Sequence, residues 1–248
     1  MTLEYAEKII KCFQDPKFIF DEKSHTYTYQ GSKFTSVTGE IGKFSQKFDS
    51  DYWSKRKAKE REITQDEILK EWKDKADVAC LLGSQVHFMI ESFLNGVDAP
   101  KPLEDEALNN KSIERFNKWY QLYLTKLIKM TPIAQELRVF SPKLKIAGTI
   151  DALFYWKDSL IVGDWKTNGD WSDDLSKGYQ KLYDPFSDLW DNTLNKYSLQ
   201  LSFYRLILEE WNIPTKAAFL CWIGPDGEAK FFPAKDLRPG LKKYYNIK

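Results

Sequence analysis

Two apolar segments that end in acidic residues and flank a short turn constrain this fold most. Residues 148–151 read Gly-Thr-Ile-Asp, and Asp164 follows Asp151 by thirteen positions. Residues 156–159 (Trp-Lys-Asp-Ser) predict a two-residue hairpin loop, in which the first and last of the four pair. The same register places Asp151 directly opposite Asp164, with Cβ atoms roughly 4.5–5.5 Å apart. Two carboxylates at this distance repel each other unless a cation lies between them.

The neighbouring strands add a lysine and a third acid. Strand alternation puts Lys166 on the same face as Asp164. With a short turn around 142–145, Ser141 pairs with Ile146, and Glu136 then lies opposite Asp151. The sequence therefore predicts a row of three carboxylates across three strands, although a one-residue slip would turn any of them to the other face.

A histidine lies in a regular pattern on the helix predicted over 74–95, which ends at Gly96. Gly83, His87 and Glu91 are four residues apart, so all three share one stripe of that helix. We expect Gly83 to admit another backbone, His87 to coordinate a cation and Glu91 to hold the imidazole ring by a hydrogen bond.

Three further regions leave alternatives open. Gln200 and Tyr204 are one turn apart on a helix predicted over 193–211. They form either a hydrogen-bonding clamp beside the strands or the polar edge of an amphipathic helix. The aromatic segment 168–191, with Trp171, could stack a single strand or form a surface insertion. The charged region 50–76 is a solvated helix face or a patch that follows phosphates.

The composition bounds the function. Lysine and arginine number 37 against 36 acids, a net charge of +1, so nucleic-acid binding must come from local patches. The three cysteines are far apart, which argues against a disulfide framework and a four-cysteine metal site. We see no signal-peptide pattern and no apolar run of ~20 residues, so we expect a cytoplasmic protein without a membrane partner.

The pattern of elements predicts an α/β fold. The three central strands form an antiparallel meander in a mixed sheet, and the helix over 193–211 serves as a crossover to the next strand. Ser36 or Thr38 is the expected N-cap of a short helix. The other expected elements are helices over 2–14 and 104–129, a hairpin of 18–20 with 26–29, and strands over 134–140, 146–156, 159–167, 215–223 and 228–232.

The motifs in this order resemble the RecB-like branch of the PD-(D/E)XK nuclease superfamily. The branch includes the RecB nuclease domain, CRISPR-adaptation nucleases, the mitochondrial genome maintenance exonuclease and many phage exonucleases. Ser36 and Thr38 also resemble related short nucleases. The motifs that carry the resemblance are Gly-x3-His-x3-Glu from Gly83, Glu136, Gly-x-Ile-Asp ending at Asp151, Asp-x-Lys-Thr from Asp164 and Gln-x3-Tyr from Gln200.

The resemblance implies a restriction-endonuclease-like core at 76–233 of a single domain, 1–248, in which 1–75 is an N-terminal hairpin and helical extension and 234–248 a tail. It implies that Lys166 is the catalytic lysine and that Glu136 reaches a second metal or its waters. Gln200 and Tyr204 would position the lysine or the DNA backbone. The implied metal ligands are His87, Asp151, Asp164 and the main-chain carbonyl of Trp165.

The donor types suit one or two Mg²⁺ or Mn²⁺ ions, and the imidazole favours Mn²⁺. The cysteines that hold an iron–sulfur cluster in some relatives are missing, so we expect none, and any helicase motor must be a separate chain. The resemblance implies a metal-dependent DNA exonuclease that acts in recombination, repair or replication. The implied partners are DNA and a recombination or replication protein. If a phage encodes the protein, the implied location is the host cytoplasm. The alternatives are a structure-specific endonuclease and a non-catalytic DNA-binding subunit.

Overall fold

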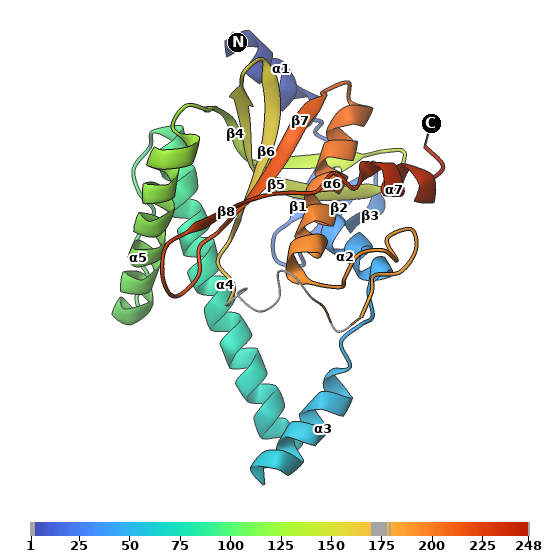
Figure 1. The fold of residues 1–248 in the computed structure, drawn as a ribbon. Coiled ribbons are helices and arrows are strands. Elements are labelled where there is room, and N and C mark those ends of the chain that lie inside the picture. Colours follow the sequence, from blue (N-terminus) through green and yellow to red (C-terminus); the bar gives the residue numbers. More distant parts are fainter. Residues whose placement is uncertain (1–2, 170–177, 179, 248) are drawn as a thin grey trace.

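The computed structural model describes residues 3–169, 178 and 180–247. Within them, eight strands form one mixed sheet with helices on both faces (Figure 1), as the α/β prediction required. The strand order is β1-β2-β3-β5-β6-β7-β8, and β4 pairs with β5. The strands are β1 (Phe18–Asp21), β2 (Thr26–Tyr29), β3 (Ser32–Ser36), β4 (Thr131–Ser141), β5 (Ile146–Trp156), β6 (Ser159–Lys166), β7 (Thr215–Trp222) and β8 (Lys230–Pro233).

The centre of the sheet is the predicted meander. Strands β4, β5 and β6 are antiparallel, and the turns set the expected pairs Ser141–Ile146 and Trp156–Ser159. Helix α6 (Thr193–Glu210) connects β6 to the parallel strand β7, which confirms the predicted crossover.

The N-terminal hairpin is part of this sheet, which the sequence did not indicate. It follows helix α1 (Leu3–Cys12) and continues into β3, which pairs in parallel with Ile146 and Ala147 of β5. The side chain of Ser36 then accepts a hydrogen bond from the Gly39 N–H and caps helix α2 (Val37–Ile41), confirming Ser36 as the N-cap. Because the chain turns into α2 and the short 3₁₀ helix η1 (Gly42–Phe44), β3 ends after two pairs with β5.

A fork in the sheet results on one side of β5. Residues 146–147 of β5 pair with β3, and residues 152–156 pair with β6. Residues 148–151 lie between these two neighbours. Among the described residues, positions 148–150 pair only with β4, and Asp151 pairs with no strand. The predicted acidic motif is therefore at an opening in an otherwise continuous sheet.

The helices form two layers over two apolar clusters. Helix α4 (Gln65–Asn95) and helix α5 (Glu106–Leu122), which continues as the π-helix η2 (Tyr123–Leu127), pack on one face. Helices α1, α2, α6 and α7 (Arg238–Tyr244) pack on the other face. Helix α4 begins nine residues before the predicted start, at Gln65, because Thr64 and Glu67 form a capping box. It ends as predicted at Gly96, which has a left-handed φ of 66°.

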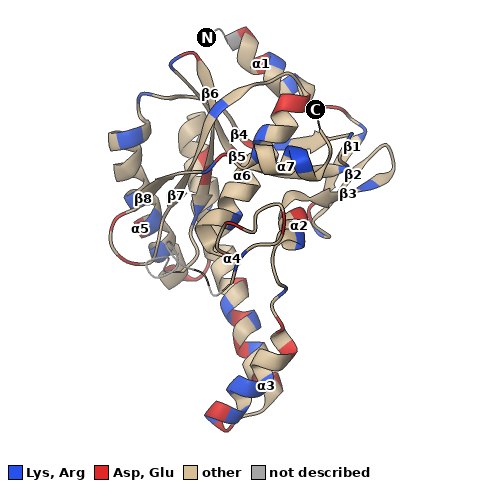
Figure 2. Cartoon of the chain, turned by 45° about the vertical axis from the view of Figure 1, so that its right-hand side comes forward, with Lys and Arg blue, Asp and Glu red and all other residues tan. Residues whose placement is uncertain are grey.

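Helix α3 (Ser50–Arg61) and the first half of α4 extend away from this body as an arm (Figure 1). Basic and acidic residues alternate along the arm (Figure 2). Several pair with each other, as in Arg56–Glu60 and Arg61–Glu71. These pairs favour the solvated-helix interpretation of region 50–76.

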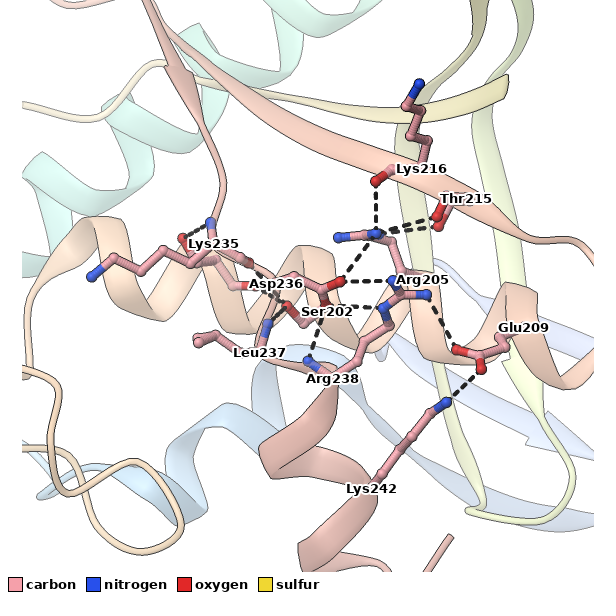
Figure 3. A network of polar contacts seen from close by, with 11 residues as sticks. Ser202, Arg205, Glu209, Thr215, Lys216, Lys235, Asp236, Leu237, Arg238 and Lys242 are labelled. Carbon is pink, nitrogen blue, oxygen red and sulfur yellow. Dashed lines mark hydrogen bonds and ion pairs between the residues drawn. The ribbon is translucent and has the colours of Figure 1, made fainter. Parts of the chain in front are cut away.

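The predicted C-terminal tail contains helix α7 and a polar network that holds it to α6 (Figure 3). Arg205 is 2% exposed and donates to the main-chain oxygens of Thr215 and Lys216, while it also pairs with Asp236. Glu209 accepts from Arg238 and Lys242 across the same interface. No helix of the described residues is long and apolar enough to cross a membrane.

Candidate functional site

The two opening aspartates lie where β5 and β6 diverge. The predicted register holds as far as the pair Ala152–Gly163, where the ladder ends. Asp151 and Asp164 are therefore not a ladder pair, which corrects the prediction by one step. Instead, Asp151 Oδ2 accepts a hydrogen bond of 2.8 Å from the main-chain N–H of Trp165, so a side chain bridges the strands in place of the backbone.

Glu136 has an unusual backbone. The pairs Leu137–Ile150 and Gln135–Ala152 keep the predicted register on either side, but Glu136 itself has a φ of 46° and does not pair with Asp151. A left-handed conformation costs a non-glycine residue about 1–3 kcal/mol and persists where the surroundings hold it. Here the Glu136 carboxylate lies 3.5 Å from His87 Nδ1.

His87 connects helix α4 to these strands. Its Nε2 lies 3.1 Å from the carbonyl oxygen of Trp165, and its Nδ1 lies 3.6 Å from Asp151. Both ring nitrogens thus have other partners, so the hydrogen bond predicted from Glu91 to the ring is wrong. Burial lowers the pKa of His87, but Asp151 and Glu136 outweigh burial and raise the pKa to about 9.

Asp164 and Lys166 form a buried ion pair on the same strand face, as predicted. Lys166 Nζ lies 2.7 Å from Asp164 Oδ2, and the two side chains are 15% and 1% exposed. Burial lowers the pKa of Lys166, but Asp164 and Asp151 outweigh burial and raise the pKa above its usual range. Lys166 is therefore a cation in this site. It also lies 4.5 Å above the ring of Tyr197.

The donor atoms fit a divalent cation. His87, Glu136 and Asp151 each offer a ligand atom, and these atoms all lie within 4.8 Å of one another. Asp164 lies outside that group, paired with Lys166, and its Oδ1 is buried without a hydrogen-bond partner among the described residues. Carboxylates with one imidazole are donors that Mn²⁺ and Mg²⁺ accept.

Two members of the group, His87 and Glu136, line a cleft of about 850 Å³ between α4 and the N-terminal hairpin, whereas Asp151, Asp164 and Lys166 lie behind its lining. The cleft brings together most of the predicted site residues. Those that line it are Ser36, Thr38, Gly83, His87, Glu91, Glu136, Gln200 and Tyr204.

Some of these residues have other contacts than predicted. A Cβ on Gly83 would lie 2.9 Å from Thr167 Oγ1, so this glycine admits a side chain and not a backbone. Gln200 donates a hydrogen bond of 3.0 Å to the Tyr204 hydroxyl. The Tyr204 ring packs on Gly148, where an added Cβ would lie 2.7 Å from the ring. Within the described part of the chain, Gln200 and Tyr204 therefore support β5, while the aromatic partner of Lys166 is Tyr197.

Sequence reasoning missed Tyr197 and Arg115. Tyr197 is three residues before Gln200 and seven before Tyr204, so the helical stripe of α6 contained it. Arg115 of α5 donates to the main-chain oxygen of Thr167, directly after Lys166. No local pattern marks Arg115, because its partner is 52 residues away along the chain.

The aromatic segment 168–191 is described only in part, and Trp171 lies outside the described residues. Phe186 is 3% exposed and its ring lies 5.1 Å from that of Phe44, so this aromatic belongs to the core. Trp190 is 38% exposed, and Lys181 lies 3.9 Å above its ring. In the described part, Phe186 therefore lies in the main core and not in a surface insertion, while Trp190 stays accessible.

No family model matches the chain, and no curated protein matches it. A solved structure described as the crystal structure of SSO0001 is similar at 15% identity with a TM-score of 0.27. The match covers 53% of this chain and 53% of the other, so the chain spans about half the length of that structure.

Proposed function

We propose that this chain is a metal-dependent deoxyribonuclease that hydrolyses phosphodiester bonds from DNA ends, in recombination, repair or replication. The observation that carries the proposal is the buried Asp164–Lys166 pair beside the group of His87, Glu136 and Asp151. Three carboxylates, an imidazole and an ammonium have little structural reason to gather at buried and half-buried positions beside a cleft, because burying charge is costly. The arrangement also supports the resemblance to RecB-like nucleases and their core.

Each part has a chemical role in this proposal. His87, Glu136 and Asp151 would hold Mg²⁺ or Mn²⁺, with Asp164 and the Trp165 carbonyl beside them, and the ion would supply positive charge and acidify a water. Lys166 is kept protonated by Asp164, so it would donate hydrogen bonds to a phosphate oxygen as negative charge develops there. Tyr197 would hold the ammonium in place from α6.

The size of the cleft favours a single strand over a duplex as the substrate. Its volume of about 850 Å³ lies within the range of small-ligand pockets. A few nucleotides of a single strand fit such a space, whereas a duplex has a major groove about 12 Å wide and is wider still as a whole.

The test compares wild type with Asp164→Asn and Lys166→Ala in Mn²⁺, on linear single-stranded DNA labelled at the 5′ or 3′ end and on a circle. We expect wild type to degrade the linear strand and spare the circle, and each variant to be slower by at least about 100-fold. Asp158→Asn is the matched control, because this exposed acid lies in the turn of the same hairpin and should leave the rate unchanged.

Other results would reassign the function. Undiminished cleavage by both site variants would overturn the assignment of this site. Cleavage of the circle would identify an endonuclease instead. Calorimetry that detects no Mn²⁺ binding to the wild type would favour a non-catalytic DNA-binding subunit.

A further inference from the structure

The cleft has an unusual balance of charge for a protein that holds a polyanion. Among the described residues that line it, three are glutamates, and Arg138 is the only lysine or arginine. On the walls of this cleft a phosphodiester strand therefore has one permanent cationic side chain to bind, in addition to the metal group and to Lys166 behind the lining. The acids are Glu22, Glu91 and Glu136.

Arg138 is held in a defined place on the cleft wall. It lies on β4, paired with Thr149 of β5, two residues beyond Glu136. Its guanidinium lies 4.9 Å from the centre of the Phe20 ring on the N-terminal hairpin. Stacking on an aromatic ring orients the planar guanidinium and leaves its N–H groups free to bind acceptors at the edge.

The present partner of Arg138 can be exchanged. Its Nη2 lies 3.1 Å from Glu22 Oε1, and the two side chains are 49% and 79% exposed. An ion pair this open to water is weak. A phosphate group binds a guanidinium through two parallel hydrogen bonds, so it competes well for the position of the Glu22 carboxylate.

The opposite wall of the cleft offers an aromatic surface. Phe88 follows His87 on α4, lines the same cleft and is 51% exposed. No ring contact within the described part of the chain involves Phe88. An accessible ring beside a phosphate-binding group is the usual platform for a base of a single strand.

We propose that Arg138 binds a phosphate of single-stranded DNA next to the bond that is cut, that Phe88 stacks a neighbouring base, and that Glu22 occupies the phosphate position in the free protein. The inference rests on the proposed function for its substrate class. It concerns binding, however, and can be tested without cleavage.

The experiment measures fluorescence anisotropy of a labelled single-stranded oligodeoxynucleotide, with Ca²⁺ replacing Mg²⁺ and Mn²⁺, over a series of KCl concentrations. We expect Arg138→Gln to weaken binding and to reduce the slope of log K against log salt by about 0.7, the value for one lost phosphate contact. Glu22→Gln should strengthen binding, and Phe88→Ala should weaken it roughly tenfold. Lys33→Gln is the control for loss of a positive charge, because Lys33 is exposed on β3 and does not line the cleft.

The outcomes separate the two proposals. If Arg138→Gln has the affinity and salt slope of wild type, or if Glu22→Gln weakens binding as much, the inference is overturned. Equal binding of duplex, or displacement by millimolar inorganic phosphate alone, would also overturn it. Binding that depends on Arg138 without any cleavage would support the inference and refute the nuclease. Cleavage that needs Lys166 but not Arg138 would do the reverse.

Discussion

At the scale of single residues, the His87 ring contacts the same acceptor groups that a bound cation would contact. Its ring nitrogens contact a carbonyl oxygen and two carboxylates, which are ligands that a metal ion also accepts. A protonated imidazole satisfies these acceptors in the metal-free protein, with a pKa raised from 6.5 to about 9. Because a metal binds only the neutral imidazole, protons and metal compete for one site.

This competition sets a pH dependence. Since the folded pKa of His87 is raised, its stabilising contribution is complete below pH 6.5 and is lost as the pH rises through about 9. Over the same interval we expect Mn²⁺ affinity to rise, by as much as about tenfold per pH unit. Calorimetry at pH 7.5 in two buffers of different ionisation enthalpy should show release of about one proton, and His87→Asn should release none. Equal heats in both buffers for the wild type would contradict the prediction.

The residues themselves were largely predictable, and their contacts were less so. Asp164 and Lys166 share a face because strands alternate, and His87 and Gly83 share a stripe because helices repeat. The left-handed backbone of Glu136 has no local sequence mark, since glutamate disfavours that conformation. Its carboxylate contacts His87, which lies 49 positions earlier in the chain, so the arrangement depends on residues that are distant in the sequence.

At the scale of elements, Gly148 joins β5 to α6. The Tyr204 ring fills the space of its missing side chain, and Val37 Cγ2 would lie 3.2 Å from an added Cβ. We expect Gly148→Ala to lower the free energy of unfolding by about 1–3 kcal/mol, because neither neighbour can move without loss of packing. Urea denaturation measures this change. The double variant Gly148→Ala with Tyr204→Leu, which lacks the ring, should lose less free energy of unfolding than the sum of the losses in the two single variants.

Gly42 is the matched control for that substitution. An added Cβ there meets nothing within 4 Å, and its φ of −59° suits alanine. Gly42→Ala should therefore leave stability unchanged or raise it by about 0.4–1 kcal/mol. If both substitutions had the same effect, the close approach of Tyr204 would not explain Gly148.

Turn chemistry predicted the strand registers, whereas long-range pairing did not follow from the sequence. Residues 156–159 allow one tight hairpin, so the pairs as far as Ala152–Gly163 could be counted. Strand β3 pairs with β5 across about 110 residues and only at two positions, which no local period indicates. Helix α7 was missed because its buried face consists mainly of Leu241.

At the scale of the whole molecule, the arm and the body should differ in local stability. In α3 only Ser54 and Ala58 are buried, whereas the second half of α4 buries Val86 and Ile90 against the sheet. Helices with few buried apolar contacts open with a small free energy. We therefore expect backbone amides in 50–76 to exchange with deuterium well before those in 82–95, as measured by mass spectrometry at neutral pH. Equal protection in the two regions would show that the arm packs more tightly than its contacts indicate.

The fork in the sheet also has a consequence for how its strands are joined. Strands β3 and β6 attach to the two ends of β5, and between them residues 148–150 pair with β4 alone. That pairing is itself interrupted at Glu136. Side chains take over where the backbone pairs stop, since the Tyr27 hydroxyl of the N-terminal hairpin lies 3.2 Å from Thr149 Oγ1. The gap in the sheet is thus spanned by side-chain contacts in place of backbone hydrogen bonds.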